Sequence, residues 1–178
     1  MRVVVTGTPG TGKTSAVEQL DTDLEVVHLN DLIRDEDLWN ERDEERDSLV
    51  ADLDAVAQRL EGREDLLVES HLAHHLDGGE RVDKDEEVDK VVVLRCHPEE
   101  LERRLTERGE SEAKAAENAE SEALDVILSE AVNTHGIENV YEIETTDRTP
   151  VEVADEIEAV VAGEREPSAG EVSYIDYL

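Results

Sequence analysis

Residues 7–15, GTPGTGKTS, combine residue types that are suited to binding phosphate. Gly7, Gly12, Lys13 and Thr14 fit the spacing G-x-x-x-x-G-K-[ST] without a gap. Glycines let the backbone approach a phosphate closely, and the amides of such a loop form an anion cradle with the next helix N-terminus. A lysine there reaches the β- and γ-phosphates, and a threonine hydroxyl can bind Mg²⁺. The stretch predicts a P-loop for a nucleoside triphosphate.

The residues on either side of this loop support the interpretation. Residues 1–7, MRVVVTG, are a short β-branched run that ends in glycine, which is typical of a buried strand entering a tight turn. Residues 14–20 place Ala16, Val17 and Leu20 at helical spacing. A dinucleotide-binding loop fits less well, because the spacing G-x-G-x-x-G is missing.

The rest of the chain alternates between short apolar runs and helical periodicity. Further strands are expected at residues 24–29, 65–70, 89–95 and 139–144, and further helices at residues 49–60, 98–108, 112–132 and 150–162. Five strands separated by helices predict an α/β fold of the P-loop NTPase class, a parallel sheet with helices on both faces. Ligands of such sheets bind at the carboxyl ends of the strands, where the P-loop begins.

We expect one compact domain at residues 1–162, followed by a C-terminal extension at residues 163–178. The extension contains Pro and Gly and has no long periodicity. Its apolar side chains are expected to pack on the domain surface; they are Tyr174, Ile175, Tyr177 and Leu178.

The chain is strongly acidic, with 49 Asp and Glu against 17 Lys and Arg and a net charge of −32. Disorder, a basic partner and adaptation to high salt could each explain this charge. The acids alternate with periodic apolar residues, which argues against disorder. In molar salt the Debye length falls to about 3 Å, so repulsion between the acidic side chains is screened. Scarce lysine and the lack of phenylalanine resemble the proteins of a salt-in halophile. The charge also argues against direct, sequence-specific binding to nucleic acid.

Two further features bear on the compartment. The sequence contains neither a leading apolar segment of signal-peptide type nor a run of 18 apolar residues, so we expect a cytoplasmic protein. Cys96 is the single cysteine, which excludes an internal disulfide and fits a reducing compartment.

Three arginines are conspicuous in the predicted helix at residues 98–108 of this acidic chain, namely Arg103, Arg104 and Arg108. Arg104 and Arg108 are four residues apart and share a helix face. Phosphoryl transfer requires positive charge around the transferring group, so these two join Lys13 as candidate catalytic residues. The alternative for each is pairing with Glu100 and with the helix C-terminal dipole.

Arg34 and Arg95 are candidates for binding the acceptor phosphate. Arg95 lies at the carboxyl end of a predicted strand, where ligands of parallel sheets bind. The alternative for both is a surface ion pair. A zinc site at His71, His74 and His75 is disfavoured, because their spacing lacks a cysteine or a glutamate at usable distance.

Several segments resemble the adenylate kinase isoenzyme 6 family in order and spacing. They are GTPGTGKTS, HLNDLIRDEDLWNERDEERD, LLVESH, VVVLRCHPEELERRLTERG and AAENAESE. That family comprises small P-loop proteins described both as adenylate kinases and as ATPases of small-ribosomal-subunit maturation. The similarity covers roughly residues 1–162.

The resemblance implies a role for each matching position. The donor ATP is held by Gly10, Gly12, Lys13, Thr14, Ser15 and Arg108. Residues 28–51 match the monophosphate-binding region, in which Asp31 and Arg34 form the element DL-x-R. Residues 107–117 match a short lid, so a nucleoside-monophosphate-kinase-like fold is implied.

One departure from the family pattern concerns the metal. The family has an Asp-Tyr-His-like triplet after the third strand, where the acid supports Mg²⁺, and here the triplet is Glu69-Ser70-His71. Glutamate is longer by one methylene, so it would reach Mg²⁺ through water or in another rotamer. Thr14 and Glu69 are the expected metal residues, and His71 is expected to orient water or the acceptor phosphate.

Three functions remain open from the sequence. The first is phosphate transfer from ATP to AMP, and the second is ATP hydrolysis by an assembly factor. The third is another small-molecule kinase, since spacing does not reveal the acceptor pocket. For the assembly factor, the resemblance implies a small-subunit ribosomal protein of the S11 (uS11) type as partner. Leu38 and Trp39 or the extension could offer it apolar contacts, although Trp39 could equally be a packing residue.

Overall fold

The computed structural model describes residues 1–45, 48–76 and 87–178. Its centre is a five-stranded parallel sheet with the strand order β2-β5-β1-β6-β7. The strands are β1 (Arg2–Thr6), β2 (Glu25–His28), β5 (Leu66–Glu69), β6 (Lys90–Arg95) and β7 (Val140–Glu144). All five lie close to their predicted positions, so the predicted parallel sheet is confirmed.

The central strand β1 determines where the P-loop lies. It pairs with β5 on one side and with β6 on the other, in a register that aligns Val5 with Glu69 and with Val92. Its valines are buried on both faces, as in other sheets covered on two sides. The P-loop therefore leaves the middle of the sheet at its carboxyl edge.

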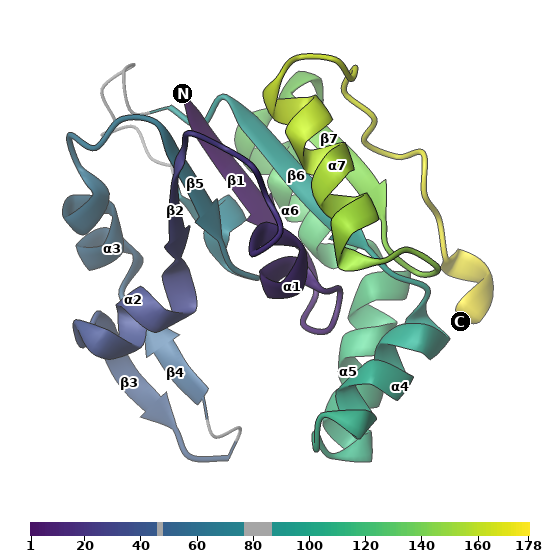
Figure 1. Cartoon of the computed structure of the whole chain (residues 1–178). Coiled ribbons are helices and arrows are strands. Elements are labelled where there is room, and N and C mark those ends of the chain that lie inside the picture. Colours follow the sequence, from purple (N-terminus) through teal and green to yellow (C-terminus); the bar gives the residue numbers. More distant parts are fainter. Residues whose placement is uncertain (46–47, 77–86) are drawn as a thin grey trace.

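Helices cover both faces of the sheet (Figure 1). On one face, Val3 and Val5 pack against α1 (Lys13–Val17) and α7 (Pro150–Val161). On the other face, Val4 belongs to the cluster formed with α2 (Leu29–Asp35), α3 (Leu53–Leu60) and α6 (Val126–His135). Because side chains alternate along a strand, one short strand supplies both cores.

Two appendages project on either side of α1 and the P-loop (Figure 1). One is the antiparallel hairpin of β3 (Trp39–Asp43) and β4 (Ser48–Ala51), which the sequence did not predict. The other is the pair α4 (Pro98–Glu107) and α5 (Glu112–Ala123), which has a small core of its own around Leu101, Leu105 and Ala115. Single-turn helices occur at η1 (Ala73–His75), η3 (Ile137–Asn139) and η4 (Ile175–Tyr177).

Two predicted helices have different bounds in the structure. The helix predicted at residues 112–132 is broken into α5 and α6 at Asp125, which has a φ of 54°. Aspartate tolerates this left-handed conformation, and here its carboxylate pairs with Arg95. The helix predicted from residue 49 begins at Leu53, because Asp52 caps it by accepting from the Ala55 amide. Residues 48–51 pair in the hairpin instead.

The C-terminal extension is bound to the domain through the buried carboxylate of Glu142. One oxygen of Glu142 accepts hydrogen bonds from the backbone amides of Gly170, Glu171 and Val172. Tyr174 is buried, as predicted, whereas Ile175 is 58% exposed and Leu178 59%. The prediction was therefore wrong for these two residues. None of the helices in the described ranges has the length and apolarity needed to cross a bilayer.

Candidate active site

The conformation of the P-loop depends on its glycines. Gly7, Gly10 and Gly12 all have positive φ, which favours glycine. A Cβ on Gly7 would lie 2.6 Å from the backbone oxygen of Leu94, so the loop and β6 are too close for any side chain there. The Leu105 side chain of α4 lies 3.0 Å from the Cβ position of Gly10. The loop is thus fixed by close packing against β6 and α4.

Lys13 is folded into this loop with a side chain that is 7% exposed. Its Nζ donates to the carbonyl oxygens of Gly7 at 2.8 Å and Thr8 at 3.1 Å. Burial lowers the pKa of Lys13 to about 8, although the charges of Glu69 and Glu122 oppose the shift. Neutral carbonyls do not compensate a buried ammonium fully, and a polyphosphate would.

The two expected metal residues meet at the carboxyl edge of the sheet. The Oγ1 of Thr14, at the start of α1, lies 3.4 Å from both carboxylate oxygens of Glu69, at the end of β5. Glu69 is buried, and its Oε2 is held by the Nδ1 of His28 at 2.8 Å. A hydroxyl and a carboxylate are the oxygen donors that Mg²⁺ prefers, so these residues fit that ion. Nothing in the residue pattern indicated the part that His28 plays.

A cleft of about 380 Å³ opens on the α4 side of the P-loop. Its lining includes Gly10, Gly12, Ser15, Arg104, Arg108 and Arg148. The structure thus brings both predicted arginines of α4 to the loop, and it adds Arg148, which the sequence did not single out. Arg103 does not line this cleft. It pairs with Glu100 and Glu107 on the helix surface, which agrees with the alternative of a helix ion pair.

The two predicted arginines of this cleft, Arg104 and Arg108, differ in how they are held. Arg104 donates to the carbonyl oxygens of Thr145 and Thr146, both at 3.1 Å, and to Glu100 at 2.9 Å. Arg108 is exposed at the end of α4, where its charge lowers the pKa of Lys13. Arg104 therefore joins α4 to the loop after β7, whereas Arg108 extends toward the solvent side of the cleft.

A second cleft, of about 550 Å³, lies on the hairpin side. Its lining includes Asn30, Arg34, Leu49, Val50, His71 and His75. Arg34 is exposed and lies 3.6 Å from Asp31, so these two predicted residues are neighbours. Burial and the charge of Lys13 lower the pKa of His71 to about 4. A neutral His71 can donate or accept a hydrogen bond at pH 7 but adds no charge.

The structure contradicts the prediction that Arg95 binds the acceptor phosphate. Its side chain is 1% exposed and bonds to Glu122 at 2.8 Å, to Asp125 at 2.5 Å and to Glu142 at 2.5 Å. Three carboxylates occupy the guanidinium, which leaves it no access to a phosphate. The strand position was read correctly, but the side chain turns into the protein, because acids from α5 and β7 surround it.

Glu122 is the residue of this region that sequence reasoning missed. Its Oε2 accepts from the Thr8 hydroxyl of the P-loop at 2.5 Å, and its Oε1 accepts from Arg95 at 2.8 Å. It thereby links α5 to the loop that surrounds Lys13. The segment AAENAESE ends at this glutamate, but among so many acids nothing distinguished it.

Comparison with known proteins is consistent with this geometry. The family model described as "AAA domain" matches residues 3–125. A protein of Natronomonas pharaonis named "Putative adenylate kinase" is 60% identical over the full length of both chains. The chain belongs to this adenylate kinase family. A relative with the same name from Methanothermobacter thermautotrophicus is 42% identical over 99% of this chain and 98% of its own.

Solved structures share the fold of this family member at low identity. A shikimate kinase of Bacteroides thetaiotaomicron has a TM-score of 0.56 at 15% identity, covering 92% of this chain and 98% of its own. A gluconokinase of Sinorhizobium meliloti has a TM-score of 0.54 at 16% identity, covering 92% of each chain. Family and fold together support a nucleoside monophosphate kinase.

Proposed function

We propose that this protein transfers the γ-phosphoryl group of ATP to AMP and so forms two molecules of ADP. The observation that carries the proposal is the pair of clefts on the two sides of the P-loop. The α4 side offers arginines to a triphosphate, and the hairpin side offers Arg34 and His71 to a monophosphate. Lys13 lies in the loop that lines the first cleft, and its charge adds to the effect of burial in lowering the pKa of His71, which lines the second.

On the donor side, the amides of the loop and Lys13 hold the phosphates, with Ser15 at the helix start. Arg108 is exposed and would contact the nucleotide as part of a lid at residues 107–117, which run from the end of α4 into α5. Arg104 is anchored nearer the loop, 3.5 Å from the oxygen of Gly10. Their positive charge stabilises the oxygens of the transferring group.

Thr14 and Glu69 hold the magnesium ion that accompanies ATP, with Glu69 oriented by His28. When bound, the ion would add positive charge beside the phosphates of ATP. The hydrogen-bonding distance between Thr14 and Glu69 supports a role for the longer glutamate beside the metal.

On the acceptor side, residues 28–51 bind the monophosphate. Arg34 contributes the charge, Asp31 steadies it through their ion pair, and neutral His71 contributes a hydrogen bond. Asn30, which accepts from the Ser70 hydroxyl at 2.8 Å, faces the same cleft and was not predicted.

A second activity is ATP hydrolysis coupled to a small-subunit ribosomal protein of the S11 type. The exposed side chains of Ile175 and Leu178 at the end of the extension favour such a partner surface. Leu38 and Trp39 are partly buried against the main core, so they contribute less to it. In high salt, apolar contacts of this kind are not screened, whereas charge attraction is. The net charge of −32 also supports action in a cytoplasm of high salt content.

A coupled assay in concentrated KCl tests the proposal, with ATP as donor and AMP, other nucleoside monophosphates or water as acceptor. Rapid ADP formation that depends on AMP is the expected result. The rate should be slower when water is the sole acceptor. Equal rates of ADP formation with and without a monophosphate would show that the protein is an ATPase and would contradict the kinase proposal. A pull-down of the ribosomal protein in molar KCl, with ATP, ADP or no nucleotide, tests the second activity.

A further inference from the structure

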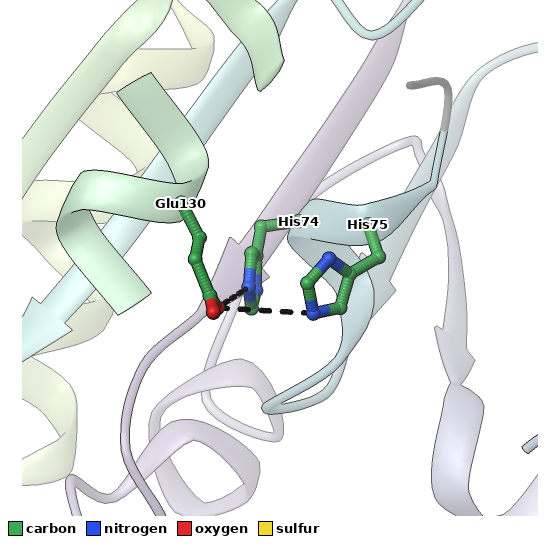
Figure 2. A group of neighbouring side chains, drawn as sticks. All are labelled: His74, His75 and Glu130. Atoms are coloured by element: carbon green, nitrogen blue, oxygen red, sulfur yellow. Dashed lines mark hydrogen bonds and ion pairs between the residues drawn. The ribbon is translucent and has the colours of Figure 1, made fainter. Parts of the chain in front are cut away.

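Three side chains converge beside the acceptor cleft, on elements that are far apart in sequence. His74 and His75 come from η1, and Glu130 comes from α6; their ligand atoms lie within 4.8 Å of one another. Figure 2 shows both imidazole rings turned toward one carboxylate oxygen. The Oε2 of Glu130 is 2.9 Å from the Nε2 of His74 and 3.8 Å from that of His75.

The surroundings hold His74 in this orientation. The Nδ1 of its buried ring is bonded to the Thr6 hydroxyl at 2.9 Å, so Nε2 is the atom that faces Glu130. The Nε2 of His135 donates to the carbonyl oxygen of His74 at 2.7 Å and fixes the backbone. Histidines that bind metals have their second ring nitrogen held by a hydrogen bond in this way.

A hydrogen bond explains part of this arrangement. The 2.9 Å contact is a hydrogen bond of normal length, whereas 3.8 Å is too long for one. An ion about 2.0–2.2 Å from each ligand atom would hold them within about 4 Å of one another, so it requires small side-chain rotations only.

We infer that His74, His75 and Glu130 bind one divalent transition-metal ion of the zinc class, with water at the remaining position. Two imidazoles and a carboxylate are a common ligand set for zinc. Nitrogen donors distinguish this site from the oxygen donors expected to hold Mg²⁺ beside the P-loop. The sequence disfavoured zinc because the spacing of the histidines offered no carboxylate, and α6 supplies one 55 residues after His75.

Bound metal would join η1 to α6. His75 also lines the acceptor cleft, so the ion would stabilise the wall of that cleft. Glu130 and His75 are both partly exposed, which gives the ion a path from solvent.

Cobalt(II) is the probe, because its visible absorption reports nitrogen coordination. Tag-free full-length protein in molar KCl with excess Mg²⁺ is titrated with Co²⁺, so that surface carboxylates are occupied or screened. We expect saturation at one equivalent, displacement by Zn²⁺, and a higher melting temperature with Zn²⁺. His75→Ala and Glu130→Gln should each weaken binding by at least about 10-fold.

Two matched variants complete the test. Glu120→Gln removes an exposed glutamate from α5, and Glu69→Gln removes the carboxylate beside the P-loop; both should keep the one-equivalent Co²⁺ spectrum. The inference is overturned if wild type shows no saturable spectrum. It is also overturned if His75→Ala and Glu130→Gln bind as tightly as wild type, or if Glu69→Gln is the variant that loses binding.

Discussion

Lys13 and Arg95 are both buried cations close to the P-loop, yet their surroundings are opposite. Lys13 donates to two neutral backbone carbonyls, and burial lowers its pKa to about 8. Arg95 is bonded to three carboxylates, from Glu122, Asp125 and Glu142. The charge of Lys13 is compensated only in part by the nearby Glu69 and Glu122, whereas Arg95 is neutralised by direct ion pairs.

This difference separates a ligand-binding cation from a structural one. Burying a charge is costly unless an opposite charge compensates it. The protein bears that cost at Lys13, where a phosphate is expected, and avoids it at Arg95. Position at the carboxyl end of a strand therefore does not identify a phosphate-binding residue, whereas the chemistry of its partners does.

The largest effect is expected from Lys13→Ala. We predict that ATP-dependent turnover falls on the order of 10³-fold or more, because positive charge on the transferring phosphate is lost. The fold should persist, since Lys13 contacts the loop backbone and not the apolar core. Turnover and far-ultraviolet circular dichroism measure the two quantities. Lys90→Met is the matched control: Lys90 donates to Val160 at the opposite edge of the sheet and should keep activity. Near-normal turnover in folded Lys13→Ala would refute the P-loop assignment.

Arg95→Met should instead reduce stability. Removing one member of a buried ion cluster costs about 3–5 kcal/mol, because the carboxylates are left unpaired. Urea unfolding in molar KCl measures the loss. Adding Glu142→Gln to Arg95→Met should recover part of it, and Arg103→Met, at an exposed pair, should lose little. If Arg95→Met were as stable as wild type but bound AMP poorly, the result would contradict the structural role and would support Arg95 as an acceptor-binding residue.

Substitutions of Arg104 and Arg108 in the donor cleft should likewise differ in their effects on activity and stability. Arg108→Ala is expected to lower kcat/KM by about 10²-fold without a change in melting temperature, since the side chain is exposed. Arg104→Ala should lower the melting temperature as well, because it breaks bonds to Thr145 and Thr146. A melting temperature that falls equally in both variants would contradict the distinction.

Salt should relieve repulsion between surface charges and should leave the stability contributed by the buried Arg95 ion pairs nearly unchanged. We predict that the wild-type melting temperature rises from dilute buffer to molar KCl, by about 2–4 °C for each kcal/mol of repulsion relieved. The stability difference between wild type and Arg95→Met should stay nearly constant, because buried pairs are screened little. An unchanged wild-type melting temperature would remove the argument for adaptation to high salt.

The smallest expected effect is the uptake of a fraction of a proton when ATP binds. Phosphates close to Lys13 favour its charged form, so ATP binding raises a pKa that is about 8 in the free protein. At pH 8, binding should take up about 0.5 proton, more at pH 9 and little at pH 7, and affinity should fall as pH rises above 8. Calorimetry in two buffers of different ionisation enthalpy measures this uptake. Lys13→Met should abolish it, and uptake that persists in that variant would assign the proton elsewhere.

Much of the donor side could be predicted from local sequence. The P-loop spacing depends on contiguous residues, and valine-rich runs identified β1 and β6. The hairpin of β3 and β4 was missed because its residues are mostly polar and exposed, so they show no clear alternation. The break at Asp125 was missed because its compensation by Arg95 comes from a distant strand.

The sequence by itself determined the phosphate-binding loop and the parallel sheet that presents it, because both follow from residue types at short, regular spacing. Only the tertiary structure decided which charged side chains serve a ligand. Arg95 is neutralised by Glu122 and Glu142, 27 and 47 residues away along the chain. Since a charge is balanced by whatever lies near it in space, its role depends on contacts that sequence spacing does not contain.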